Sequence, residues 1–244
     1  MSRAQRSIWK HDADSEIWQD RYYVNVEPSR SVDEHDIRTR HAIARELAAQ
    51  LGPWKACLEI GCGTGANLAS IQAERRVGVD VSQGMVEQAR ALHSEFEFQR
   101  VDLGEFLDPN RFDLILCLGV VQYLDSLELL LACVRRNLAP DGVLIVSWPN
   151  ERSWFRWVHY LLFPRSRGNA DFRSEEFVGM MSEQGLELLT FEGHSCAFPW
   201  VPDPMARLNL WLERGLSAFR STPLKSWIEE HLAFSHIAAF RWRV

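Results

Sequence analysis

The strongest chemical signal in the sequence is a glycine-rich run, LEIGCGTGAN, at residues 58–67. It follows a predicted strand and precedes a predicted helix, so Gly61, Gly63 and Gly65 would let a ligand approach bare backbone amides. Glu59 stands just before the first glycine. Its carboxylate would repel a pyrophosphate and attract a ligand that carries a positive charge.

Two further acidic residues close later predicted strands. Asp80 ends the strand after the glycine run, where a carboxylate can hold the two hydroxyls of a ribose. Asp102 ends the next strand, beside the position expected for an adenine amino group. These acids predict a nucleoside ligand without deciding which one. The spacing Gly61-x-Gly63-x-x-Ala66 also fits a dinucleotide fingerprint, so a nicotinamide-dependent oxidoreductase stays open at this point.

Short apolar strands alternate with helical segments around these residues. The expected strands are Ala56–Ile60, Arg76–Asp80, Glu95–Asp102, Phe112–Leu118 and Val143–Trp148. Helical spacing over 83–93 and 127–138 separates them. Strands that alternate with helices pair in parallel through right-handed crossovers, which predicts a doubly wound, Rossmann-like α/β sheet.

Composition excludes several classes of protein. The 244 residues carry a net charge of −6, which argues against non-specific nucleic-acid binding. We find no apolar run long enough to cross a bilayer and no signal peptide, so we expect a cytoplasmic protein. The five cysteines are odd in number and form no CxxC pair, which indicates buried thiols and no metal site.

The flanks of this alternating core are rich in aromatic residues. We expect one domain, with an N-terminal helical cap over 1–50, a ligand-binding core over 51–150, cap insertions over 151–232 around a sixth strand, and a last strand over 233–244. The aromatic side chains could wall an acceptor pocket or bury the cap against the sheet. The candidates for substrate contact are Tyr22, Tyr23, Trp148, Trp154 and Trp157.

Five blocks in order carry a resemblance to a known family: LEIGCGTGANL, GVDVS, VDL, FDLILCLGVVQYL and LAPDGVLIVSWPN. They resemble class I S-adenosylmethionine-dependent methyltransferases of the small-molecule type, which include ubiquinone-biosynthesis enzymes. The resemblance implies a seven-stranded sheet whose last strand is antiparallel, with 234–244 supplying that strand.

The same resemblance implies S-adenosylmethionine as cofactor and S-adenosylhomocysteine as product. Glu59, the loop glycines and Cys62 would then line the methionine end of the cofactor. Asp80 and Val81 would lie at the ribose, and Asp102 and Leu103 at the adenine. Leu118 would form the rim of the site.

Methyl transfer from a sulfonium is an in-line displacement that depends on positioning and on exclusion of water. It needs no metal, and it needs a base only if the acceptor is a hydroxyl. The family often has a histidine pair after the fourth strand, where this chain has Gln122 and Tyr123. His194 opens the stretch after the sixth strand, which in related folds lies over the acceptor. His194, Tyr123 and Gln122 are therefore the catalytic candidates.

We expect methyl transfer to a small or carrier-linked acceptor, preferably a hydroxyl of a glycan, glycolipid or secondary metabolite. N-methylation of a small amine and the role of a non-catalytic cofactor-binding partner protein compete with this interpretation. Four arginines could also meet a phosphate or an anionic membrane, so peripheral membrane contact stays open. They are Arg152, Arg156, Arg165 and Arg167.

Overall fold

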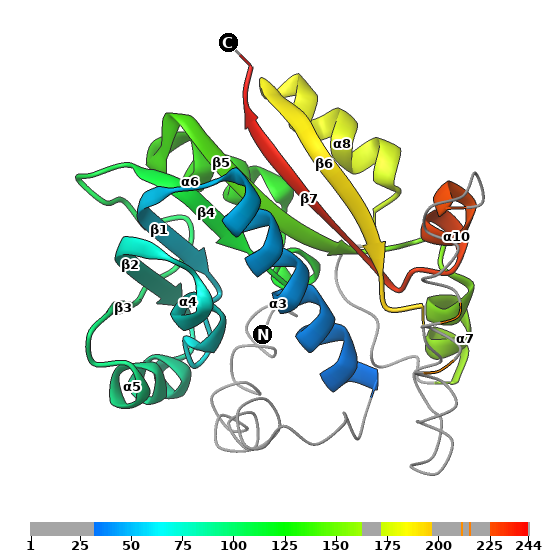
Figure 1. Cartoon of the computed structure of the whole chain (residues 1–244), viewed down its shortest axis with the longest axis horizontal. Helices are drawn as coiled ribbons and strands as arrows, with labels where there is room; N and C mark the ends of the chain where they lie inside the picture. The colour runs from blue at the N-terminus through cyan, green and yellow to red at the C-terminus, as the bar shows by residue number, and fades with distance from the viewer. Residues whose placement is uncertain (1–31, 163–171, 197–210, 212–214, 216–224, 244) are drawn as a thin grey trace.

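The core of the chain is a seven-stranded sheet with the strand order β3-β2-β1-β4-β5-β7-β6 (Figure 1). The computed structural model describes residues 32–162, 172–196 and 225–243, together with 211 and 215. The strands are β1 (Trp54–Ile60), β2 (Ala73–Asp80), β3 (Glu97–Arg100), β4 (Phe112–Cys117), β5 (Leu138–Pro149), β6 (Leu186–His194) and β7 (Ser235–Trp242).

The direction of the strands brings their ends together. Strands β1 to β5 pair in parallel, and β7 runs antiparallel to both β5 and β6. Strand β6 is therefore parallel to β5, so β1 to β6 all end at one edge of the sheet, which we call the carboxyl edge. The prediction of a doubly wound sheet with an antiparallel last strand is confirmed. Open sheets of this kind bind ligands at the carboxyl edge.

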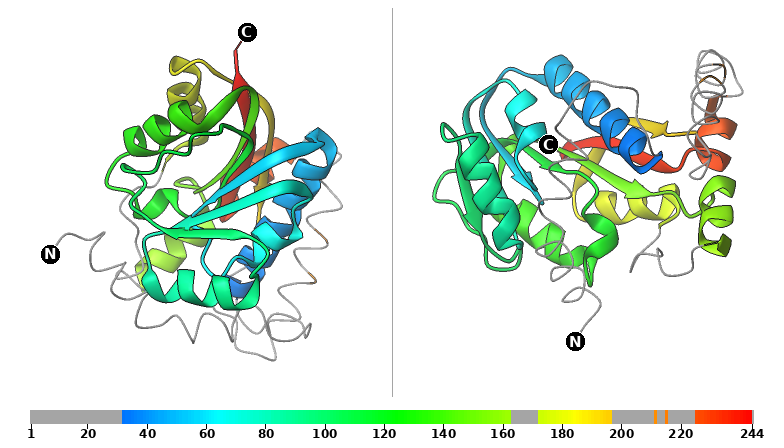
Figure 2. Two further views of the ribbon diagram at one scale, coloured as in Figure 1. Left: turned by 90° about the vertical axis from the view of Figure 1, so that its left-hand side faces the viewer. Right: turned by 90° about the horizontal axis from the view of Figure 1, so that it is seen from below.

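Helices cover both faces of the sheet (Figure 2). One face is covered by α3 (Val32–Leu51), α4 (Ala66–Ser70) and α5 (Gln83–Leu92), and the other by α6 (Leu127–Asn137) and α8 (Ser174–Glu183). Alternate residues of β4 serve the two layers: Leu114 and Leu116 pack with the first set, and Ile115 and Cys117 with the second. Burial on both faces explains why this strand is apolar throughout.

The predicted strands differ in their bounds from those of the structure, most clearly at β5 and β3. Strand β5 begins at Leu138, earlier than expected, and β3 ends at Arg100, earlier than the predicted Asp102. Asp102 lies in the turn that follows, where its Oδ1 accepts a hydrogen bond from the Gly104 amide at 2.8 Å. Short polar side chains favour such turns, which is why the strand stops before this residue.

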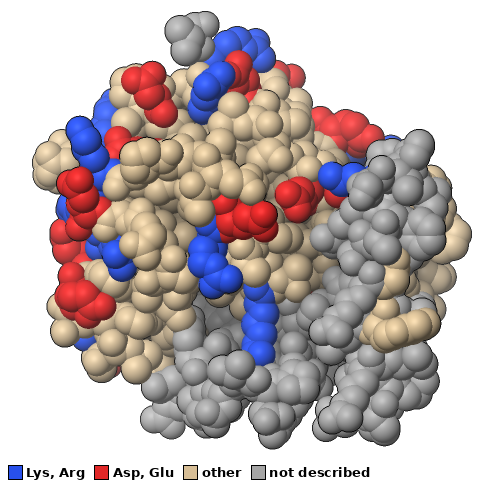
Figure 3. Space-filling model, in the orientation of Figure 1, with Lys and Arg blue, Asp and Glu red and all other residues tan. Residues whose placement is uncertain are grey.

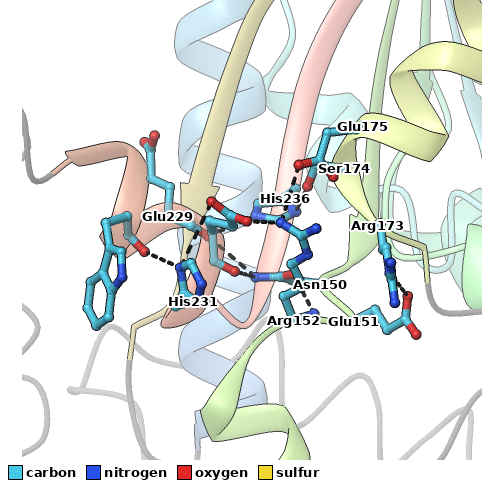
Figure 4. Close-up of polar contacts among 11 residues, drawn as sticks. Asn150, Glu151, Arg152, Arg173, Ser174, Glu175, Glu229, His231 and His236 are labelled. Carbon is cyan, nitrogen blue, oxygen red and sulfur yellow. Dashed lines mark hydrogen bonds and ion pairs between the residues drawn. The ribbon is translucent and has the colours of Figure 1, made fainter.

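A small cap lies beyond the end of β5, built from α7 (Trp154–Leu162) and α10 (Lys225–His231). Asn150, labelled in Figure 4, connects the two segments. Its Nδ2 donates to the carbonyl oxygens of Glu230 at 2.9 Å and Ala233 at 2.8 Å. The side chain of Asn150 is buried, and these bonds satisfy it.

We expect Phe177→Ala to destabilise the sheet more than truncation of an exposed aromatic side chain. Phe177 is fully buried and stacks on Trp148 with ring centroids 4.0 Å apart. Truncation of a buried phenylalanine lowers the free energy of unfolding by about 3–5 kcal/mol. Urea denaturation followed by circular dichroism measures it, with Trp154→Ala, 62% exposed, as the control. Equal losses in both variants would contradict the assignment of this layer to the core.

Candidate active site

The glycine loop begins at the end of β1 and is shaped by backbone that only glycine adopts readily. Gly61, Gly63 and Gly65 have φ values of 69°, 53° and 81°. A Cβ atom on Gly61 would lie 2.2 Å from Val120 Cγ2, whereas a Cβ on Gly63 would meet no atom of the described residues within 4 Å. The loop is therefore packed against the chain at Gly61 and open at Gly63, where a ligand can approach the backbone.

Asp80, at the end of β2, holds this loop in place. Its Oδ2 accepts a hydrogen bond from the Gly63 amide at 2.9 Å, and its Oδ1 accepts one from the Ser82 amide at 2.9 Å. The side chain is half-buried. A carboxylate oxygen accepts more than one hydrogen bond, so Asp80 can shape the loop and still bind two ligand hydroxyls.

Glu59 lies beneath the loop and is 3% exposed. Its Oε1 accepts a hydrogen bond from Asn67 Nδ2 at 2.7 Å, and its Oε2 has no hydrogen-bond partner in the described part of the chain. Burial raises the pKa of Glu59 to about 8, against the opposing effect of the bond from Asn67. A carboxyl group in this state is well suited to a ligand that brings a positive charge.

The other predicted cofactor residues surround the same edge. Asp102 is exposed in the turn after β3, and Val81 is half-buried beside Asp80. Leu103 and Leu118 are 8% and 7% exposed and belong to the two core layers, and Cys62 is 5% exposed. All are positioned at the ends of adjacent strands, as a nucleoside site at the carboxyl edge requires.

The three catalytic candidates occupy two places. Gln122 and Tyr123 lie in a short 3₁₀ helix after β4, η1 (Val121–Tyr123). Gln122 Nε2 donates to the Gly119 carbonyl at 2.9 Å, and Tyr123 is 40% exposed. His194 ends β6 and is fully buried. Strands β5 and β7 separate β4 from β6, so these residues do not form one cluster.

The aromatic candidates for substrate contact have different positions. Tyr22 and Tyr23 lie outside the described residues. Trp148 is 1% exposed and stacks on Phe177 beneath α8, so it belongs to the core and does not wall an open pocket. Trp154 and Trp157 are 62% and 67% exposed on α7. Both indoles therefore lie on the surface of the described part of the chain.

Several residues at this edge make contacts that the sequence did not predict. Asn67 holds Glu59, and Ser147 Oγ accepts the Gly119 amide at 2.9 Å in the loop after β4. Asp36 and Arg40 are buried on α3 and lie 3.3 Å apart through Oδ2 and Nη1. Their opposite charges at i and i+4 on a helix were the available signal, but such pairs are usually exposed.

The arrangement fits a cationic nucleoside. It combines a loop open at Gly63 with a carboxylate at the end of β2 and an incompletely bonded carboxyl group at Glu59. Among the described residues, no group of three His, Cys, Asp or Glu side chains could hold a metal ion. On the face in Figure 3, acidic and basic side chains of the described residues are interspersed.

Glu59 makes a pH-dependent contribution to stability. Because its pKa in the folded chain, about 8, lies above its ordinary value of 4.5, the contribution is present below pH 4.5 and is lost as the pH rises through 8. We expect the neutral variant Glu59→Gln to lose less stability than the parent chain between about pH 5 and 9. Thermal melts at each pH measure this, and parallel curves for the two proteins would contradict a raised pKa.

Comparisons with known proteins agree with this geometry. A family model described as a methyltransferase domain matches residues 58–144. A trans-aconitate 2-methyltransferase from Azoarcus sp. (strain BH72) is 32% identical over 138 residues, 54% of this chain and 51% of that protein. A ubiquinone biosynthesis O-methyltransferase from Pasteurella multocida (strain Pm70) is 24% identical over 190 residues, 67% of this chain and 76% of that protein.

Solved structures share the fold. The N-methyltransferase NodS from Bradyrhizobium japonicum WM9, in complex with S-adenosyl-L-homocysteine, superimposes with a TM-score of 0.62 and 17% identity and covers 99% of each chain. The family match over the glycine loop and the following strands decides against a nicotinamide-dependent oxidoreductase. Residues 58–144 therefore match a methyltransferase domain, and the sheet around them has the fold of class I S-adenosylmethionine-dependent methyltransferases.

Proposed function

We propose that this protein transfers the methyl group of S-adenosylmethionine to a small or carrier-linked acceptor. The observation that carries the proposal is the glycine loop, which is open at Gly63 and bonded through its amide to Asp80. The cofactor supplies an electrophilic methyl group on a positively charged sulfur. The chain spans about half the length of the trans-aconitate methyltransferase that it matches, 51%, so its own substrate is part of the proposal.

Residues at the ends of neighbouring strands would contact different parts of the cofactor. Asp80 would bind the ribose hydroxyls, and Glu59 would balance the positive charge from beneath the loop. Binding of a cation favours the ionised form of Glu59, so it would lower the raised pKa of this carboxyl group. Asp102 and Leu103 would lie at the adenine, and Leu118 at the rim.

A hydroxyl of a glycan, glycolipid or secondary metabolite is the acceptor we favour. The relative from Pasteurella multocida is an O-methyltransferase by name, and NodS is an N-methyltransferase by name, although NodS shares only the fold. A small amine is therefore the acceptor to compare with a hydroxyl.

The setting of the reaction is also part of the proposal. The net charge of −6 supports a small acceptor and argues against nucleic acid. Among the described residues, no helix has the length and apolarity that crossing a membrane requires. We favour a cytoplasmic location, with the exposed Trp154 and Trp157 as the place where a peripheral membrane contact would form.

Titration of the purified chain with two ligands tests the cofactor. We expect isothermal titration calorimetry to show binding of S-adenosylhomocysteine and none of NAD⁺, and the opposite result would overturn the proposal. Release of S-adenosylhomocysteine is then measured with hydroxyl acceptors (catechol, a methyl galactoside), an amine (butylamine) and a carboxylate (trans-aconitate). Tight cofactor binding without transfer to any acceptor in a broadened panel would favour a non-catalytic cofactor-binding protein.

We expect Asp80→Ala to weaken binding of S-adenosylhomocysteine by about 1–3 kcal/mol, or roughly 5- to 150-fold in Kd. The variant loses the ribose contact and the bond that holds the Gly63 amide. Glu74→Gln is the matched control, because it neutralises an exposed acid near the other end of the same strand. An unchanged Kd for Asp80→Ala in calorimetry would contradict the assignment of the ribose site.

A further inference from the structure

A buried polar cluster connects α3 with the end of β6. Asp36 and Arg40 come from α3, and His194 and Ser195 from the end of β6. Their exposed fractions are 7%, 9%, 0% and 0%, so the cluster is shielded from water. Buried charged and polar groups are costly unless they are paired, which makes the contacts within this cluster informative.

The imidazole of His194 has two unlike sides. Its Nδ1 lies 3.0 Å from Ser195 Oγ and 3.3 Å from Asp36 Oδ1. Burial alone would raise the pKa of Asp36, yet Arg40, His194 and Ser195 together hold it well below its usual value. Asp36 is therefore a carboxylate, and it favours the tautomer of His194 that carries its proton on Nδ1.

The other nitrogen of the ring is buried. Among the described residues, neither His194 Nε2 nor Arg40 Nε has a hydrogen-bond partner. Asp36 Oδ1, which contacts His194 Nδ1 at 3.3 Å, is the third buried atom of this cluster without a hydrogen bond to the described residues. Unsatisfied buried polar atoms are costly, so three of them in one cluster need an explanation. Hydrogen bonds of catalytic groups are often long without substrate and tighten when it binds.

A second buried histidine shows what a structural role looks like in this chain. His236 lies on β7, and burial lowers its pKa to about 4. Its Nδ1 lies 2.8 Å from Ser174 Oγ and its Nε2 2.9 Å from the Glu229 carbonyl oxygen (Figure 4). Both nitrogens of His236 are satisfied. His194, on the neighbouring strand, has one nitrogen left for a ligand.

The backbone beside His194 is strained. Ser195 has a φ of 61°, and among the described residues no other non-glycine residue has a positive φ. A serine in this conformation costs free energy, and such residues gather at functional sites, where the surrounding structure enforces them. The strain here places the Ser195 hydroxyl against Nδ1 of His194.

A continuous series of contacts joins this cluster to the cofactor loop. A Cβ atom on Gly119 would lie 3.0 Å from the guanidinium carbon of Arg40, and the neighbouring Val120 packs against Gly61. Arg40 in turn contacts Asp36. His194 is thus connected, through α3 and the loop after β4, to the place where the methyl group would be presented.

We propose that His194 is the general base for a hydroxyl acceptor and that Asp36 is the residue that positions it. This inference rests on the proposed function. As the acceptor oxygen bonds to the methyl carbon, the carbon–sulfur bond breaks and its electron pair stays on sulfur. The hydroxyl proton passes to His194 Nε2, and Asp36 stabilises the imidazolium that forms. Arg40 holds Asp36 ionised and aligned.

The first experiment determines which ring nitrogen of His194 carries the proton, and it needs no acceptor. Nuclear magnetic resonance of the full chain, with ¹⁵N-labelled histidine and bound S-adenosylhomocysteine, reports the protonated nitrogen of each ring. We expect Nδ1–H for His194 and the opposite tautomer, Nε2–H, for His236, and Asp36→Asn should reverse the tautomer of His194 alone. An Nε2–H tautomer for His194 in the parent chain would overturn the proposal.

Kinetics with the four acceptors named above form the second measurement. We expect His194→Gln to lower kcat for catechol or the galactoside by about 100-fold or more. Transfer to trans-aconitate, whose carboxylate has no proton to lose, should keep its rate. Asp36→Asn should lower kcat more than it raises KM. Glu46→Gln, which removes an exposed acid from the same helix, is the matched control.

The outcomes separate this inference from the proposed function. If the parent chain methylates a hydroxyl and His194→Gln does so at the same rate, the inference fails and the proposed function stands. Transfer by the parent chain to the amine or carboxylate alone would also overturn it. If S-adenosylhomocysteine binds but no acceptor is methylated, the proposed function fails. The tautomer of His194 then still tests whether Asp36 orients its imidazole.

Discussion

The hydrogen bond between the Gly63 amide and Asp80, 2.9 Å long, is the constraint on which the site depends. It joins the loop after β1 to the end of β2, and Gly63 forms it with a φ of 53°, a conformation that glycine adopts readily. The parallel pairing of β1 and β2 brings the two partners to one edge. Once they are joined, the open side of the loop and the carboxylate face the same space. A nucleoside with a ribose and a cationic centre is the ligand that such a space fits.

The carboxyl edge has two functional halves. The glycine loop and Asp80, at the ends of β1 and β2, are the proposed cofactor site. The cluster of Asp36, Arg40 and His194 lies at the other half, between α3 and β6. The loop after β4 touches both, because Val120 packs on the glycine loop and Gly119 lies against Arg40. Donor and acceptor sites would thus share one sheet edge, which is how positioning can supply much of the rate of a displacement.

The fold and the position of the glycine loop were predictable from sequence, because strand alternation and glycine spacing are local signals. Burial was harder to predict. Trp148 lies near the carboxyl end of β5, where pocket residues are expected, but a tertiary stack on Phe177 places it in the core. Asp36 looks like one of many helix acids, and only the folding of α3 across the sheet brings it to His194. Contacts between residues so distant in the chain leave no periodic trace in one sequence.

A crystal structure of the chain grown with S-adenosylhomocysteine tests the central claim most directly. The account predicts density for the ligand at the carboxyl edge, with its ribose hydroxyls on Asp80 and its chain along the open side of Gly63. Ligand bound at another place on the molecule, with the glycine loop and Asp80 unchanged, would contradict the account.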